Sequence, residues 1–147
     1  MTDSKYDESL NNPAQPISRE ALEYLRKDLA KVPKGTPVVV ATHLCFDAIT
    51  NRDEFIDAFG DASIKLVLGG HYHKATVNKY KGINFVQLSS PAPGSSREIT
   101  VIRIDSERLI ATPFDHEKGQ WCADPKKVRD TQIKGPRVKS ATATRPE

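Results

Sequence analysis

Two short apolar runs constrain the fold of this 147-residue chain more than any other feature. Residues 38–41 (Val-Val-Val-Ala) and 64–68 (Ile-Lys-Leu-Val-Leu) are too brief for helices and rich in β-branched or branched apolar residues, so both are predicted to be strands. The first run contains no polar residue, which is typical of a strand buried on both faces. A helical pattern lies between the two runs, and this order favours a parallel pair joined by a crossover.

Two helices are predicted, one before each strand. The first spans residues 18–31, with Ser18 as its N-cap. Its apolar residues recur at spacings of three and four along one face: Leu22, Leu25, Leu29 and Val32. The second is predicted to begin at Asn51, which has Glu54 three residues later, and to end at Gly60. The first half therefore has the order α-β-α-β.

The second half of the chain has the alternation and turns of antiparallel strands. Residues 76–80, 83–88, 98–104 and 108–114 are each predicted to be a strand. Turns at 81–82 and 105–107 connect neighbouring strands, and a Pro/Ser-rich loop occupies 89–96. We therefore predict a mixed α/β (α+β) fold, α-β-α-β followed by an antiparallel meander.

Charge and turn residues divide the chain into three parts. Residues 1–16 are predicted to be an irregular lead-in, 17–115 the folded part, and 116–147 a flexible tail. The net charge is +3, but the tail alone has 8 Lys and Arg against 4 Asp and Glu. Trp121 is the one aromatic residue of the tail. Single-stranded nucleic acid is usually bound by several aromatic side chains that stack on its bases, so nucleic acid is not an expected partner.

Several classes of protein are excluded by the composition. No run approaches the roughly 20 apolar residues of a membrane span. The first residues lack the apolar region of a secretory signal, which favours a cytoplasmic location. Two cysteines, Cys45 and Cys122, are too few for a disulfide scaffold.

Three histidines follow the two predicted strands. His43 comes directly after the first strand, and His71 and His73 follow Gly69-Gly70 after the second. Parallel strands present their carboxyl ends at one edge of a sheet, so the three imidazoles are expected to converge there as metal ligands. Each histidine taken alone is more often a hydrogen-bonded structural residue. Cys45 is expected to pack as a small apolar side chain rather than act as a nucleophile with His43.

These motifs resemble the second half of a calcineurin-like metallophosphoesterase. The segments are P-V-V-V-A-T-H, ending at His43, and V-L-G-G-H-Y-H, ending at His73, with His71 standing 28 positions after His43. The resemblance implies a sandwich of two β-sheets flanked by helices, and a phosphate-ester substrate. It also implies two divalent metal ions, with His43 and His71 binding one and His73 the other. Imidazoles accept Mn, Fe and Zn alike, so the ligands do not identify the metals.

The other motifs of that family are absent from the sequence. They are D-x-H, G-D-x-x-D and G-N-H-D or G-N-H-E, which supply the bridging aspartate, further ligands and a catalytic histidine. No catalytic residue is identified here, and repulsion between two unbridged cations predicts a poor dinuclear site and little or no hydrolysis by this chain alone. The missing half is expected upstream in the gene, on a partner chain, or lost. The alternative is a non-catalytic metal-binding or dimerising remnant.

Overall fold

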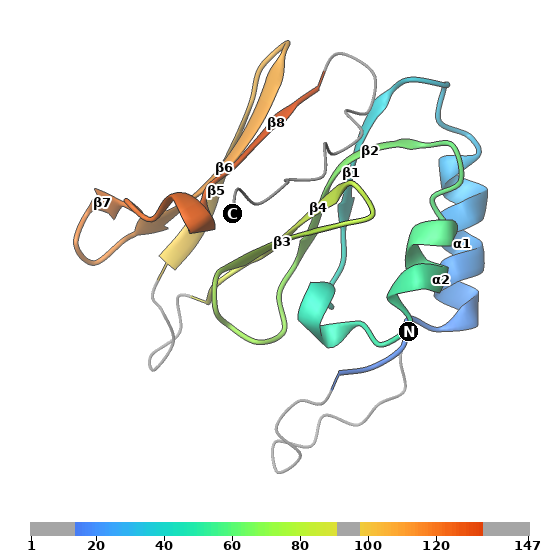
Figure 1. The fold of residues 1–147 in the computed structure, drawn as a ribbon, viewed down its shortest axis with the longest axis horizontal. Coiled ribbons are helices and arrows are strands. Elements are labelled where there is room, and N and C mark those ends of the chain that lie inside the picture. The colour runs from blue at the N-terminus through green and yellow to red at the C-terminus, as the bar shows by residue number, and fades with distance from the viewer. Residues whose placement is uncertain (1–13, 91–97, 134–147) are drawn as a thin grey trace, which may run out of the picture.

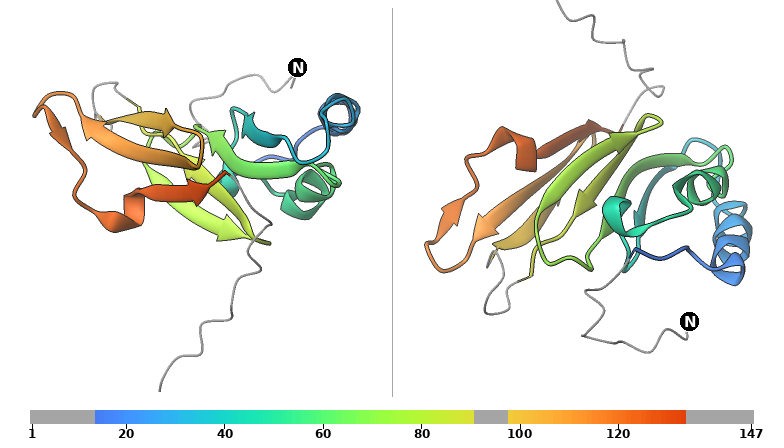
Figure 2. Two further views of the ribbon diagram at one scale, coloured as in Figure 1. Left: turned by 90° about the horizontal axis from the view of Figure 1, so that it is seen from above. Right: turned by 60° about the horizontal axis from the view of Figure 1, so that its bottom comes forward.

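The computed structural model describes residues 14–90 and 98–133, which form three layers (Figure 1). Helices cover one face of a four-stranded sheet, and a second sheet lies against its other face (Figure 2). The helices are α1 (Arg19–Leu29) and α2 (Arg52–Asp57), with short 3₁₀ turns η2 (Phe46–Ala48) and η3 (Pro125–Lys127). The strands are β1 (Pro37–Ala41), β2 (Ser63–Gly69), β3 (Thr76–Tyr80), β4 (Ile83–Gln87), β5 (Glu98–Ile104), β6 (Arg108–Asp115), β7 (Gln120–Trp121) and β8 (Arg129–Gln132).

Helix α1 forms where its capping residue and apolar spacing predict. The Ser18 hydroxyl accepts a hydrogen bond from the Ala21 amide at 3.2 Å, which satisfies one free N–H of the first turn. Leu22 and Leu29 are buried from the same face of the helix. The helix therefore packs on the sheet through the face that its sequence marks as apolar.

The first sheet has the strand order β1-β2-β4-β3. β1 is parallel to β2, as predicted, and β4 is parallel to β2 on its other side. The prediction that β1 is buried on both faces is wrong. Only Val40 of this strand is buried, and Val39 on the opposite face is 38% exposed. β1 is an edge strand, and its Val39 face lines a pocket of about 890 Å³ together with Ile104 and Leu109 of the second sheet, instead of packing closely against that sheet.

Two apolar clusters hold the three layers together. The larger joins the helices to the first sheet and includes Leu22, Val40, Phe55, Phe59, Val67 and Phe85. The smaller joins the two sheets and includes Leu66, Val86, Leu109 and Ala111. The fold is thus mixed α/β with two sheets and few helices, which confirms the predicted fold class.

The four strands predicted as one meander are divided between the two sheets. β3 and β4 form an antiparallel hairpin that joins the first sheet, because Phe85 of β4 pairs with Val67 of β2. β5 and β6 form a second antiparallel hairpin in the other sheet. The strand limits agree closely with the prediction, whereas the sheet to which each strand belongs depends on contacts distant in sequence.

Part of the predicted flexible tail is folded. β7 continues the second sheet beyond β6, with Trp121 opposite Phe114, and β8 pairs with β6 through Arg129 opposite Ala111. These strands were not predicted because the segment is polar and lacks the apolar alternation of a strand. They pair with β6 through the backbone. Residues 134–147 of the predicted tail, and 1–13 of the predicted lead-in, lie outside the described residues.

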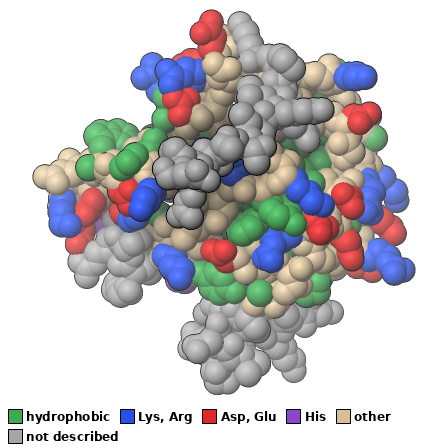
Figure 3. All heavy atoms as spheres, in the orientation of Figure 1, with side chains coloured by type: hydrophobic (Ala, Val, Ile, Leu, Met, Phe, Trp, Pro, Cys, Tyr) green, Lys and Arg blue, Asp and Glu red, His purple; other side chains and the backbone are tan. Residues whose placement is uncertain are grey.

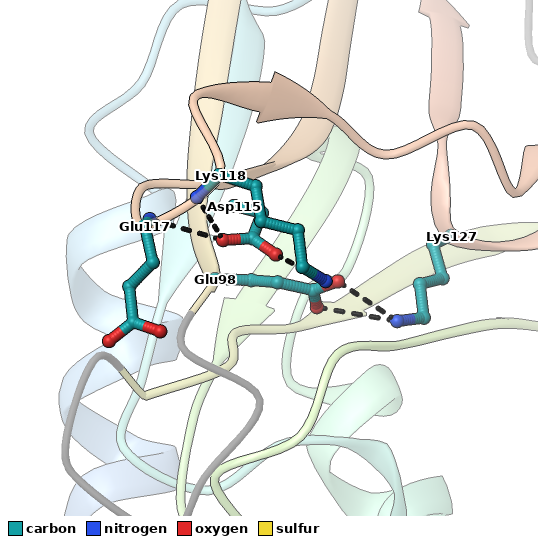
Figure 4. A network of polar contacts seen from close by, with 5 residues as sticks. All are labelled: Glu98, Asp115, Glu117, Lys118 and Lys127. Atoms are coloured by element: carbon teal, nitrogen blue, oxygen red, sulfur yellow. Dashed lines mark hydrogen bonds and ion pairs between the residues drawn. The ribbon is translucent and has the colours of Figure 1, made fainter.

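Polar contacts attach this segment to the second sheet (Figure 4). Lys127 donates to the Glu98 carboxylate at 3.1 and 3.3 Å, and this hydrogen bond raises the pKa of Lys127. The Asp115 carboxylate accepts from the backbone amides of Lys118 and Glu117, and the first of these hydrogen bonds is the main cause of its lowered pKa. These contacts close the β6–β7 turn and fix η3 against β5.

The two α-helices of the described residues are short, with 11 and 6 residues. No helix in 14–90 or 98–133 combines the length and apolar character needed to cross a membrane. Acidic and basic side chains are interspersed over the face shown in Figure 3. The basic side chains therefore do not form a single positively charged patch on that face.

Asn51 connects the starts of the two helices, and its removal is expected to destabilise the protein. Its side chain accepts from the Ile17 amide at 2.8 Å and donates to the Ile17 carbonyl and to Glu54, both at 3.1 Å. We expect Asn51→Ala to lower the free energy of unfolding by about 1–3 kcal/mol, because it leaves partly buried backbone groups unpaired. Urea denaturation measures this change. The exposed neighbour Thr50 supplies the control, Thr50→Ala, and equal effects of the two substitutions would contradict the assignment.

Candidate metal centre

The hydrogen bonds between β1 and β2 continue past the ends of both strands. The Thr42 amide donates to the Leu68 carbonyl at 2.9 Å, and the Gly70 amide donates to the His43 carbonyl at 2.8 Å. These bonds extend the parallel pairing by about two residues into the loops. They place the backbone of His43 beside the backbone that leads into His71.

Gly69 allows the loop after β1 to lie directly on the end of β2. A Cβ at this position would lie 2.7 Å from the Cys45 Cβ and 2.7 Å from the Leu44 carbonyl oxygen, closer than real Cβ atoms approach. Only glycine fits without displacing the loop. The first glycine of the pair is therefore needed for close packing.

The unusual backbone of this loop lies at the histidines. His71 has φ 81° and His73 has φ 55°, whereas Gly69 and Gly70 do not have positive φ. The irregular backbone therefore lies at the two histidines and not at the glycine pair before them. A non-glycine residue in the left-handed region costs free energy and persists only where its surroundings hold it, which is common at functional sites.

His43 and His71 bring two ring nitrogens within 3.2 Å of each other. The atoms are Nε2 of His43 and Nδ1 of His71, and the two rings are perpendicular. Two imidazoles bound to one ion at 2.0–2.1 Å have their nitrogens about 3.0–3.4 Å apart. The same distance suits an N–H···N hydrogen bond between neutral rings. His71 is 7% exposed and His43 is exposed, so one side of the pair is open to solvent.

His73 follows two residues later, and its side chain is exposed. Within 14–90 and 98–133, no group of three or more His, Cys, Asp or Glu side chains is arranged to hold a metal ion. The structure therefore brings together two of the three predicted ligands. The assignment of His43, His71 and His73 as metal ligands stays a prediction.

Cys45 lies beside this site but is buried in the core. It has no exposed surface, and desolvation by burial raises the pKa of its thiol to about 11. The thiol is therefore protonated at neutral pH and is a poor nucleophile. Its burial confirms that Cys45 packs as a small apolar side chain.

One polar residue near the site was not singled out from the sequence. Gln87, at the end of β4, is 1% exposed, and its amide nitrogen donates to the Lys74 carbonyl at 3.0 Å. The residue opposite it in β2 is Gly69. The signal that could have indicated it is its place in the alternation of β4, where Gln87 follows Ile83 and Phe85 on the same face.

The fold is similar to that of a known two-metal enzyme. The crystal structure of a dimetal phosphatase from Danio rerio matches 80% of this chain with a TM-score of 0.56 and 15% sequence identity. Over the matched residues, the chain therefore shares the fold of that phosphatase. The chain spans 38% of the length of that phosphatase. No protein-family model matches the sequence, and no curated protein matches it either.

The close packing at Gly69 predicts that alanine substitution there is much more destabilising than alanine substitution at Gly70. Gly69→Ala is expected to lower the free energy of unfolding by about 2 kcal/mol or more, because the new methyl group overlaps backbone and core atoms. A Cβ at Gly70 would meet only the His43 carbonyl at 3.8 Å, an ordinary contact. Gly70→Ala is therefore the matched control, with an effect of about 1 kcal/mol or less. Thermal and urea unfolding measure both variants, and equal losses would contradict the packing argument.

The raised pKa of Cys45 predicts how stability changes in alkali. The folded state favours the protonated thiol, so this contribution to stability is complete below about pH 9 and is lost as the pH rises toward 11. We expect wild type to lose about 2–3 kcal/mol more than Cys45→Ala between pH 8.5 and 11, measured by urea denaturation at each pH. Parallel pH curves for the two proteins would show that the thiol titrates normally in the folded state.

Proposed function

We propose that this chain carries the histidine half of a metal-dependent phosphoesterase site. In this proposal His43 and His71 bind one divalent ion, and His73 binds a second. The main support is the 3.2 Å approach of the His43 and His71 nitrogens at the carboxyl ends of two parallel strands. The metallophosphoesterase-like fold supports the same assignment.

The donor pair suits a divalent ion. Coordination requires His43 Nε2 and His71 Nδ1 to be unprotonated, so each ring would keep its proton on its other nitrogen. The buried ring of His71 provides a fixed donor, while the exposed ring of His43 leaves the ion accessible from solvent. A bound ion at this position would polarise a phosphate oxygen and lower the pKa of a coordinated water.

The described residues fit one ion better than two. Two nitrogens at ligand spacing are present, but the described ranges offer no group of three potential ligands. Two divalent ions without a bridging carboxylate repel each other strongly. We therefore infer that this chain hydrolyses phosphate esters slowly or not at all unless further polypeptide, on this chain or on a partner, supplies the carboxylates.

The second candidate function is a non-catalytic metal-binding or dimerising module. The observation that favours metal binding without catalysis is the same pair of histidines, because two imidazoles with water as further ligands suffice to hold one ion weakly. The two candidates differ in whether activity appears once the carboxylates are supplied.

Metal titration of the 147-residue chain tests the histidine assignment. We expect Zn²⁺ and Mn²⁺ to bind, and His43→Ala and His71→Ala each to weaken the affinity at least about tenfold, because each removes a direct ligand. His116→Ala is the matched control, since His116 is exposed in the turn after β6 and should leave the affinity unchanged. Isothermal titration calorimetry measures both affinity and stoichiometry.

The same proteins should be assayed with bis-p-nitrophenyl phosphate and Mn²⁺. Turnover no faster than the metal blank is expected for wild type. Robust turnover that is lost in His71→Ala would contradict the proposed dependence on further ligands. Metal binding that is unaffected by His43→Ala and His71→Ala would contradict the histidine site itself.

A further inference from the structure

The buried polar or charged residues among those described are His71 and Gln87, which are 7% and 1% exposed. They lie at the same end of two neighbouring strands. Gln87 is opposite Gly69 in β2, two residues before His71, and opposite Thr76 in β3, three residues after His73. Gln87 therefore lies between the two strands that the histidine loop, residues 70–75, connects.

The Gln87 side chain holds the far end of the histidine loop. Its Nε2 donates to the Lys74 carbonyl at 3.0 Å. At the near end, the Gly70 amide donates to the His43 carbonyl, and the Tyr72 side chain packs against the larger apolar cluster. The two left-handed residues lie between these attachments. Since such conformations persist only where the surroundings enforce them, the Lys74 contact helps to keep His73 in its observed backbone state.

An amide at position 87 is costly for stability. The Oε1 atom of Gln87 is buried without a hydrogen-bond partner, and so is Oγ1 of Thr76 directly across the strand pair. A buried polar atom without a partner destabilises a protein by about 1–3 kcal/mol. Methionine has nearly the same length and no such atom, and Lys74 itself is an exposed residue. Stability alone therefore does not explain an amide here.

We propose that Gln87 is a positioning residue for the histidine loop, and that it sets the metal affinity of the site. The proposal rests on the proposed function. By fixing the Lys74 carbonyl, the buried amide keeps the backbone of His71 and His73 in the left-handed conformation that presents their imidazoles. Groups that hold metal ligands from behind in this way commonly change affinity by 10- to 100-fold when removed.

The decisive variant is Gln87→Met, because stability and metal affinity should change in opposite directions. We expect its urea midpoint to equal or exceed that of wild type, and its Zn²⁺ affinity to fall about 10-fold or more. Ile83→Met is the matched control, since Ile83 is also 1% exposed and packs in the larger cluster at the other end of β4. It should bind Zn²⁺ within about twofold of wild type.

Hydrogen exchange of the metal-free proteins gives a readout that does not depend on metal. Amides of residues 70–75 should exchange faster in Gln87→Met than in wild type and Ile83→Met. If the loop exchanges faster in Gln87→Met but the wild-type protein binds no Zn²⁺, the role of Gln87 in the loop is supported and only the proposed function is overturned. Unchanged exchange together with unchanged Zn²⁺ affinity would overturn the role of Gln87.

A purely structural role is also distinguishable. If stability and Zn²⁺ affinity fall together in Gln87→Met, the residue supports folding in general, and the positioning role is overturned. A second variant, Gln87→Leu, shows whether an effect seen in Gln87→Met comes from loss of the amide or from the methionine side chain itself. Loss of folding in both variants would have the same meaning as a joint fall in stability and affinity.

Discussion

The close contact between Gly69 and the loop after β1 is the constraint on which the rest of the site depends. Because position 69 has no side chain, Leu44 and Cys45 lie directly against the end of β2. This contact allows the backbone pairing of the two strands to continue as far as His43 and Gly70. The backbone packing therefore brings the two histidines to the same place, where their imidazoles approach to 3.2 Å.

The same end of the sheet concentrates features that reduce stability. Two histidines adopt left-handed backbone conformations, and two buried oxygens, on Thr76 and Gln87, lack partners. The centre of the fold has the opposite character, with apolar clusters on both faces of the first sheet. Free energy gained in the core thus offsets local costs at the strand ends, which is the usual distribution in proteins whose sites need fixed polar groups.

Local patterns were sufficient to predict the individual elements, but not their neighbours. Ser18, the apolar face of α1 and the limits of β3 were all evident from spacing and capping preferences. The exposure of Val39 could not be predicted, because an apolar strand has the same sequence whether or not a second sheet covers it. β8 was missed since its pairing with β6 depends on backbone bonds that polar residues make equally well. At the site, the histidines were predicted from sequence, whereas the amide of Gln87 was recognised from its burial in the structure.

The position of β1 at the edge of its sheet has a geometric consequence for the ligand set. A parallel edge strand presents unpaired backbone groups along its outer side, and here that side ends at His43. A parallel strand added there, in a register that ends level with His43, would direct its following residues toward the two imidazoles. Extending the sheet and supplying further ligands would therefore be a single structural event.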